Sequence, residues 1–214
     1  MLLNPLEIER TSLKIIDDKI AKSFNGTKSE LEIVKRVIHA TADFDFAEIL
    51  KFYDNAILKA HDAIKSHTQI ITDTKMISAG INKNAASKFN LQIIQPEDDE
   101  NIFKQARERN VTRAIINIEN AVKNFPNAIY VIGNAPTALI KLCELVKLNL
   151  AKPALIIGVP VGFVNVIEAK EILFNLKDTP KIISHGNKGG STVACAIVNA
   201  LLYGLSKKFL TATP

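Results

Sequence analysis

Arg36 and His39 stand three residues apart in KRVIHATADFDF, residues 35–46, and their types suit them to bind and protonate a ligand. On a helix this spacing places both side chains on one side, away from an apolar stripe. Asp43, four residues beyond His39, could orient the imidazole if the helix extends that far. Spacing alone favours a solvent-exposed histidine or one that caps local backbone. The stripe comprises Leu31, Ile33, Val34, Val37 and Ile38.

Four glycine-rich or polar corners follow apolar runs elsewhere in the chain. They are Asp73 and Thr74 after IIT, GNAPT at 133–137, GVPVGF at 158–163 and GNKGGS at 186–191. The carboxyl ends of parallel strands share one edge of a sheet, which is where ligands bind. Small residues let the backbone approach a ligand, and helix N-termini point N–H groups at an anion. Each corner alone fits a strand end, a helix start or close helix packing, but four together favour a binding edge.

The corners lack the signatures of nucleotide and metal sites. GNKGGS is not GxxxxGK[ST], and no GxGxxG opens the first unit of strand and helix, so nucleotide binding is a weak alternative. Cys143 and Cys195 lie in apolar segments without CxxC spacing, which predicts buried free thiols and no metal site. The net charge of +5 favours anionic partners. Because the lysines are scattered and aromatic residues make up 6%, we expect a small polyanion and no nucleic acid.

The elements that must position these residues follow from the hydrophobic periodicity. An N-terminal helical segment is predicted over 5–20, from 28 onward with Ser29 as a cap, and over 46–66. Short β-branched runs without alternation then predict parallel strands covered on both faces. These runs are TQIITD, LQIIQ, AIYVIG, PALIIGV and KIISHG, with helices predicted between and after them at 74–80, 100–124, 136–148, 165–176 and 190–207. We therefore expect an α/β fold whose central, mostly parallel sheet has about five strands flanked by helices.

The 214 residues suit one domain spanning 1–214, because no Pro-rich, Ser-rich or highly charged linker divides them. No apolar run reaches the roughly 20 residues of a membrane helix, and MLLNPLEIER is unlike a secretory signal peptide. We therefore expect a cytoplasmic protein without a membrane partner.

Five segments, in this order, resemble the precorrin-8X and cobalt-precorrin-8 methylmutase family of corrinoid biosynthesis. They are RVIHATADFD, ITDTKMISAGI, VIGNAPTAL, PALIIGVPVGFVNVIEAKE and GNKGGSTVACAIVNAL. The resemblance spans nearly the whole chain and is weakest between residues 81 and 110. It implies an α/β homodimer that needs no cofactor or protein-bound metal. Its reaction is an intramolecular methyl migration between neighbouring ring-C carbons of a polycarboxylate tetrapyrrole, which gives hydrogenobyrinate or cobyrinate.

The resemblance also implies roles for particular residues. His39 would be the catalytic acid and base, and Ser12 and Arg36 would contact the substrate. We expect further substrate contacts from Thr72, Asp73, Arg113, Asn134, Thr137, Gly189, Gly190 and Ser191. An alternative function is a corrinoid carrier that binds the tetrapyrrole without turnover. The two differ in that only a mutase changes the chromophore.

Overall fold

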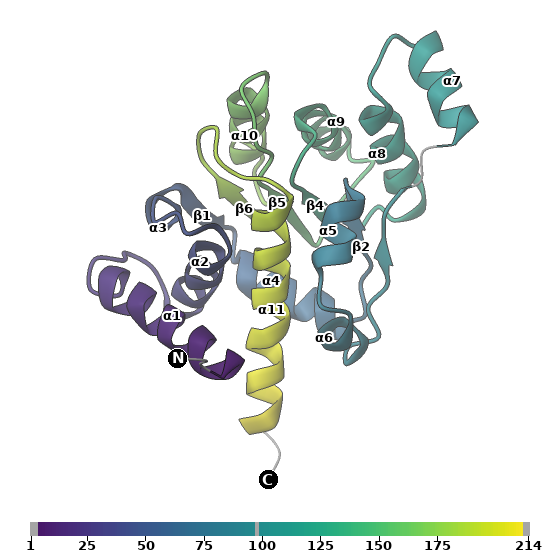
Figure 1. The fold of residues 1–214 in the computed structure, drawn as a ribbon. Helices are drawn as coiled ribbons and strands as arrows, with labels where there is room; N and C mark the ends of the chain where they lie inside the picture. The colour runs from purple at the N-terminus through teal and green to yellow at the C-terminus, as the bar shows by residue number, and fades with distance from the viewer. Residues whose placement is uncertain (1–3, 97–98, 212–214) are drawn as a thin grey trace.

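In the computed structural model, which describes residues 4–96 and 99–211, six strands form one twisted sheet (Figure 1). The order across the sheet is β1-β6-β5-β4-β2-β3. The five strands from β6 to β3 are parallel, and β1 pairs antiparallel with β6 at the edge. The strands are β1 (Leu50–Tyr53), β2 (Ile70–Thr72), β3 (Ile93–Ile94), β4 (Ile129–Ile132), β5 (Leu155–Gly158) and β6 (Lys181–Ser184). This confirms the α/β fold with a mostly parallel sheet.

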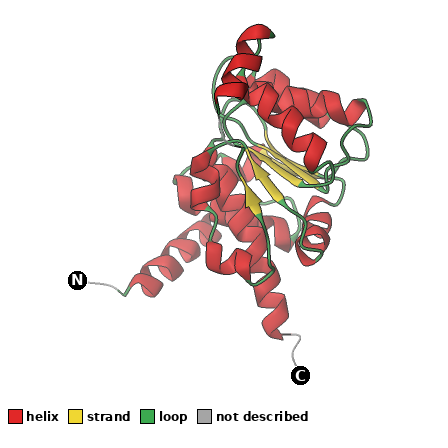
Figure 2. Cartoon of the chain, turned by 90° about the vertical axis from the view of Figure 1, so that its right-hand side faces the viewer, coloured by secondary structure: helices red, strands yellow, loops and turns green. Residues whose placement is uncertain are grey.

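Helices cover both faces of the sheet, so that the strands lie between two helical layers (Figure 2). One layer comprises α1 (Pro5–Ile20), α2 (Lys28–Thr41), α4 (Ala56–Lys65), α5 (Lys75–Gly80), α6 (Lys83–Ser87) and α11 (Ser191–Thr211). The other comprises α8 (Arg113–Asn124), α9 (Pro136–Lys147) and α10 (Val166–Phe174). The short α3 (Phe46–Ile49) precedes β1, and α7 (Glu100–Glu108) packs on α8.

Burial on both faces explains why the inner strands are mostly apolar. Every residue of β4, β5 and β6 is buried. Along β4, Ile129 and Val131 enter the core beneath α11, whereas Tyr130 and Ile132 enter the core beneath α9. Cys143 and Cys195 are free and buried, one in each core, as predicted.

The prediction of a single helix over residues 46–66 is wrong. The chain instead forms α3, then β1, then α4, with Asp54 and Asn55 in left-handed conformations between strand and helix. Tyr53 pairs with Lys181 in the register of β1 on β6. The apolar residues within 46–66 fit both the helical period of 3.6 and the strand period of 2. Residues 50–53 form a strand because they pair with the edge of the sheet.

Two other boundaries differ from the prediction. Thr27, and not Ser29, caps α2: its Oγ1 accepts from Glu30 N at 3.3 Å, while Glu30 Oε2 accepts from Thr27 N at 2.6 Å. The helix predicted over 100–124 is broken into α7 and α8 at Asn110, whose φ is +49°. Among the described residues, none of the helices is long and apolar enough to cross a membrane.

Candidate functional site

The predicted corners do share one edge, because β2, β4, β5 and β6 are adjacent and parallel. At this edge the Asp73 carboxylate binds the backbone that leads from β4 into α9. Its Oδ1 accepts from Gly133 N at 3.0 Å, and its Oδ2 accepts from Asn134 N and Ala135 N, each at 2.8 Å. Burial raises the pKa of the Asp73 carboxyl above its ordinary value, and these three N–H donors oppose the rise.

This arrangement changes how the GNAPT corner is interpreted. The sequence suggested that its N–H groups would face an anionic ligand, but three of them face an internal carboxylate. Asp73 therefore ties β2 to β4 and α9, and ligand contacts at this corner must come from side chains.

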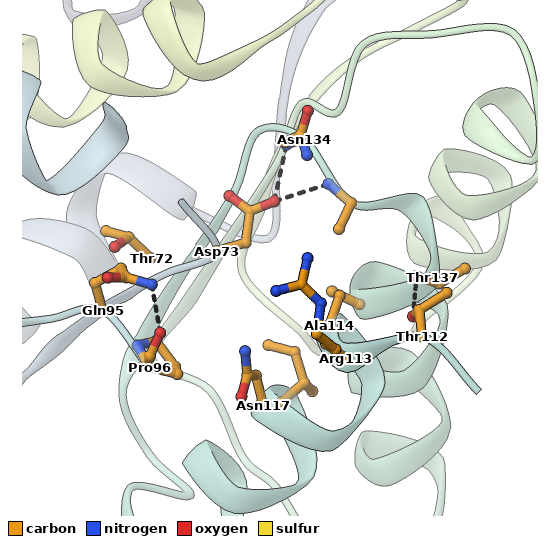
Figure 3. A pocket seen from close by; sticks show the side chains of 13 residues that line it. Thr72, Asp73, Gln95, Pro96, Thr112, Arg113, Ala114, Asn117, Asn134 and Thr137 are labelled. Carbon is orange, nitrogen blue, oxygen red and sulfur yellow. Dashed lines mark hydrogen bonds between the residues drawn. The ribbon is translucent and has the colours of Figure 1, made fainter. Parts of the chain in front are cut away.

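Such side chains line a cavity of about 310 Å³ beside Asp73. Figure 3 shows the Arg113 guanidinium, from the first turn of α8, pointing into this space below the Asp73 carboxylate. Five predicted residues line it together: Thr72, Asp73, Arg113, Asn134 and Thr137. We call it the Arg113 cavity.

The walls of the Arg113 cavity are fixed by local contacts. Thr137 and Thr112 hydroxyls lie 2.9 Å apart, which joins the starts of α9 and α8. The Arg113 guanidinium carbon lies 4.7 Å from the centre of the Phe103 ring, a cation–π contact. Sequence reasoning missed Gln95, Thr112 and Asn117 as lining residues. No signal marked Thr112 or Asn117, because the helix predicted over 100–124 runs through both and hides the start of α8 at Arg113.

Arg36 lines a second cavity of about 320 Å³ on the other side of α5. We call it the Arg36 cavity. Arg36 Nη1 donates to Glu9 Oε1 of α1 at 2.8 Å, and its guanidinium carbon lies 5.1 Å from the Tyr203 ring centre. The sequence reasoning missed the residues of α11 that line this cavity, although their spacing places them on one face of a helix. These residues are Thr192, Cys195, Ala196, Asn199 and Tyr203.

His39 does not line the Arg36 cavity, although the next residue in the sequence, Ala40, does. It is exposed in the last turn of α2, where a positive imidazolium would interact favourably with the helix dipole. The expectation that Asp43 orients His39 is wrong, because α2 ends at Thr41 and Asp43 Oδ2 binds Lys188 Nζ at 2.6 Å. The predicted placement of Arg36 and His39 away from the apolar stripe is confirmed.

The three predicted residues of the GNKGGS corner line neither of these cavities. A Cβ on Gly189 would lie 2.2 Å from Val159 O, and Gly190 has a φ of +117°, so both positions need glycine. Ser191 Oγ lies 3.1 Å from Thr74 Oγ1, at the start of α5. Close packing thus accounts for the two glycines.

Ser12 is half-buried on α1, one turn after Glu9, and its Oγ donates to Ile8 O at 2.8 Å within that helix. The predicted residues therefore fall into several places. Five line the Arg113 cavity and Arg36 lines the Arg36 cavity. His39 at the end of α2, Ser12 on α1 and the three residues of the glycine corner line neither cavity. Within the described part of the chain, no three His, Cys, Asp or Glu side chains are grouped to hold a metal ion.

A mostly parallel sheet between two helical layers, with the Arg113 cavity at the carboxyl ends of β2 and β4, is the architecture of α/β proteins that bind small molecules at their strand ends. Residues 7–204 match the family model described as precorrin-8X methylmutase, and the chain belongs to this family. This confirms the resemblance found in the sequence.

Individual relatives agree with the family match. The cobalt-precorrin-8 methylmutase of Leptospira interrogans is 40% identical over 208 residues, covering 94% of this chain and 94% of that protein. The precorrin-8X methylmutase of Pseudomonas aeruginosa is 35% identical over 178 residues, covering 82% of this chain and 85% of that protein. The crystal structure of precorrin-8X methyl mutase from Thermus thermophilus has a TM-score of 0.85 at 35% identity, covering 94% of this chain and 97% of that one.

Proposed function

We propose that this protein is an isomerase of cobalamin biosynthesis that moves a methyl group between adjacent ring-C carbons of precorrin-8X or cobalt-precorrin-8. The products are hydrogenobyrinate and cobyrinate respectively. The observation that carries the proposal is the family match over residues 7–204. The relatives described above bear enzyme names, which favours turnover over the alternative of a corrinoid carrier.

His39 is the proposed acid and base of this reaction. The migration breaks one carbon–carbon bond of the methyl group and forms another, with no net oxidation and no net proton change. A proton placed on a ring nitrogen by His39 and later returned would favour the rearranged pattern of double bonds. General acid catalysis of this kind contributes on the order of 10²–10⁴-fold, or about 3–5 kcal/mol. His39 is exposed in the last turn of α2, which leaves the imidazole accessible to a substrate.

Arginine side chains are the proposed partners of the substrate carboxylates. Arg113 points into its cavity, and the planar guanidinium of Arg36 keeps several N–H donors besides the one that binds Glu9. We include Ser12, Thr72, Asn134, Thr137 and Ser191 as substrate contacts, and assign Asp73, Gly189 and Gly190 to shaping the same edge.

We further propose that the chain acts as a homodimer, as a single domain over residues 1–214, in the cytoplasm. The two cavities, of about 310 and 320 Å³, lie at the small end of the ligand-pocket range of roughly 300–1,000 Å³. A macrocycle of four pyrrole-derived rings with its carboxylate side chains is larger than either. A second chain that completes the walls would resolve this mismatch, and sedimentation equilibrium of the purified protein tests it.

An absorbance-monitored incubation with each substrate tests the function itself. A mutase converts precorrin-8X or cobalt-precorrin-8 to a corrin spectrum, whereas a carrier binds without converting the chromophore. Binding without conversion would therefore establish the carrier, and failure to bind either compound would contradict both functions.

A further inference from the structure

Lys170 of α10 is a buried lysine whose ammonium group faces the loop between β6 and α11. The residue is 1% exposed. Its Nζ donates to the carbonyl oxygen of Gly186 at 2.7 Å and to that of Lys188 at 2.9 Å. Burying an ammonium group costs free energy that these two bonds only partly offset, and burial lowers the pKa of Lys170 to about 8.

The loop held by Lys170 is fixed at further points. Ser184 Oγ donates to the same Lys188 carbonyl at 2.8 Å, and Gly190 N donates to Val159 O at 2.8 Å. Asn187 Nδ2 also donates to Gly162 O at 2.6 Å. The backbone that precedes α11 is therefore anchored to β6 and to the residue that follows β5, and Lys170 binds the carbonyls of Gly186 and Lys188 within it.

The anchored loop reaches across to the helix that carries His39. The Lys188 side chain points away from Lys170, and its Nζ binds Asp43 Oδ2 at 2.6 Å and Asp45 Oδ2 at 2.5 Å. These two carboxylates belong to the segment that follows α2, four and six residues after His39. A continuous chain of contacts thus runs from Lys170, through the backbone and side chain of Lys188, to the end of α2.

We propose that Lys170 is a positioning residue for the methylmutase reaction: it fixes the loop of Lys188, and through Lys188 the C-terminal end of α2 and His39. This inference rests on the proposed function, because it assumes that His39 reacts with the substrate. A misplacement of about 1 Å far from the reacting atoms can cost about 10²-fold in rate. Lys170 is therefore expected to affect turnover more than substrate binding.

A role in stability alone does not call for a lysine at this position. Well-packed apolar side chains often replace buried charged groups with no loss of stability. The protein offers a comparison in Lys181, which is 3% exposed and donates to Leu176 O at 2.6 Å and Thr179 O at 3.2 Å. Among the described residues it differs from Lys170 in that it also pairs with a carboxylate, Asp54 Oδ2, at 2.5 Å. Lys181 is the first residue of β6 and lies at the amino edge of the parallel strands, opposite the candidate site. Lys170 instead binds the loop at the carboxyl edge.

The test compares Lys170→Met with Lys181→Met, since each removes a buried ammonium group that binds two backbone carbonyls. Lys181→Met also removes the ion pair with Asp54, so it is the more disruptive change of the two. Turnover of precorrin-8X and cobalt-precorrin-8 is measured per folded molecule. We expect Lys170→Met to lose roughly 10- to 100-fold in kcat with KM within about threefold of wild type. Lys181→Met should keep a kcat near that of wild type. Equal losses of kcat in the two variants would overturn the proposal.

Amide hydrogen exchange over residues 185–191 provides a readout that needs no substrate. Lys170→Met should speed exchange at Gly190 N, and Lys181→Met should not. If the wild-type protein turns over neither compound, the proposed function fails, while the exchange comparison still tests whether Lys170 fixes the loop. If Lys170→Met does not fold, Ser184→Ala takes its place, because it removes the other donor to Lys188 O. Unchanged kcat and exchange in Ser184→Ala would then refute the inference.

Discussion

Asp73 and Asn134 meet at the start of α9, where the carboxylate Oδ2 lies 2.8 Å from the backbone nitrogen. The contact joins the end of β2 to the corner that follows β4, sixty-one residues later in the chain. It places a negative charge at the positive end of α9, a favourable arrangement. The same contact occupies an N–H group that would otherwise face the ligand, which leaves Arg113 as the positive group pointing into this cavity.

Asp73→Ala should destabilise the protein by about 2–4 kcal/mol, because it removes the acceptor of three backbone N–H groups at a helix start. Asp73→Asn should cost less, since its single amide oxygen can still accept from Asn134 N and Ala135 N, although its NH2 group cannot accept from Gly133 N. Urea unfolding of the three proteins gives the free energies. An Asp73→Ala variant as stable as wild type would show that water satisfies these N–H groups equally well.

Arg36→Ala should chiefly weaken substrate binding, with a Kd about 10- to 100-fold higher, because a bond to a charged carboxylate is worth about 1.5–3 kcal/mol. Glu9→Gln is the matched control, since it breaks the same ion pair but leaves the guanidinium in place. Its Kd should equal or fall below that of wild type. Titrations monitored by chromophore absorbance measure both, and a Kd unchanged in Arg36→Ala would remove Arg36 from the site.

Lys170 should make stability depend on pH in the alkaline range. Burial lowers its pKa from 10.5 to about 8, so between these values the unfolded chain binds more protons than the folded one. The stability of the wild-type protein relative to Lys170→Met should therefore increase as pH rises through this window, by at most about 1.4 kcal/mol per pH unit. Urea titrations of both proteins at the two ends of the window measure this, and a constant difference would contradict the shift.

The carboxyl edge of the parallel strands could be predicted from the sequence, because short apolar runs followed by polar or glycine residues mark where these strands end. Apolar runs too short for helices predicted parallel strands, and Asp73 and Gly133 directly follow two of them. The edge strand β1 was missed because the apolar residues of LKFY fit a helix as well as a strand. Only the pairing of this segment with β6 shows that it is a strand. Local periodicity carries no information about that pairing.

Partner choice within the candidate site was less predictable still. The sequence spacing connected Asp43 with His39, but the left-handed Ala42 ends α2 and turns Asp43 toward Lys188, 145 residues away. Likewise nothing local to GNAPT indicates that Asp73 binds its N–H groups. The residue types at strand ends can be read from the sequence. Which of these side chains bind one another across the sheet edge is set by the tertiary fold, so the sequence does not show it.

The role of His39 is the central claim, and the most direct test is an absorbance-monitored single-turnover assay of wild type and His39→Ala with cobalt-precorrin-8 and with precorrin-8X. His67→Ala is the control, because His67 binds Phe89 O at the amino edge of the sheet. We predict conversion to a corrin spectrum by wild type and His67→Ala. His39→Ala should bind the substrate but lose about 10²–10⁴-fold in rate. Conversion by His39→Ala at the wild-type rate would contradict the account.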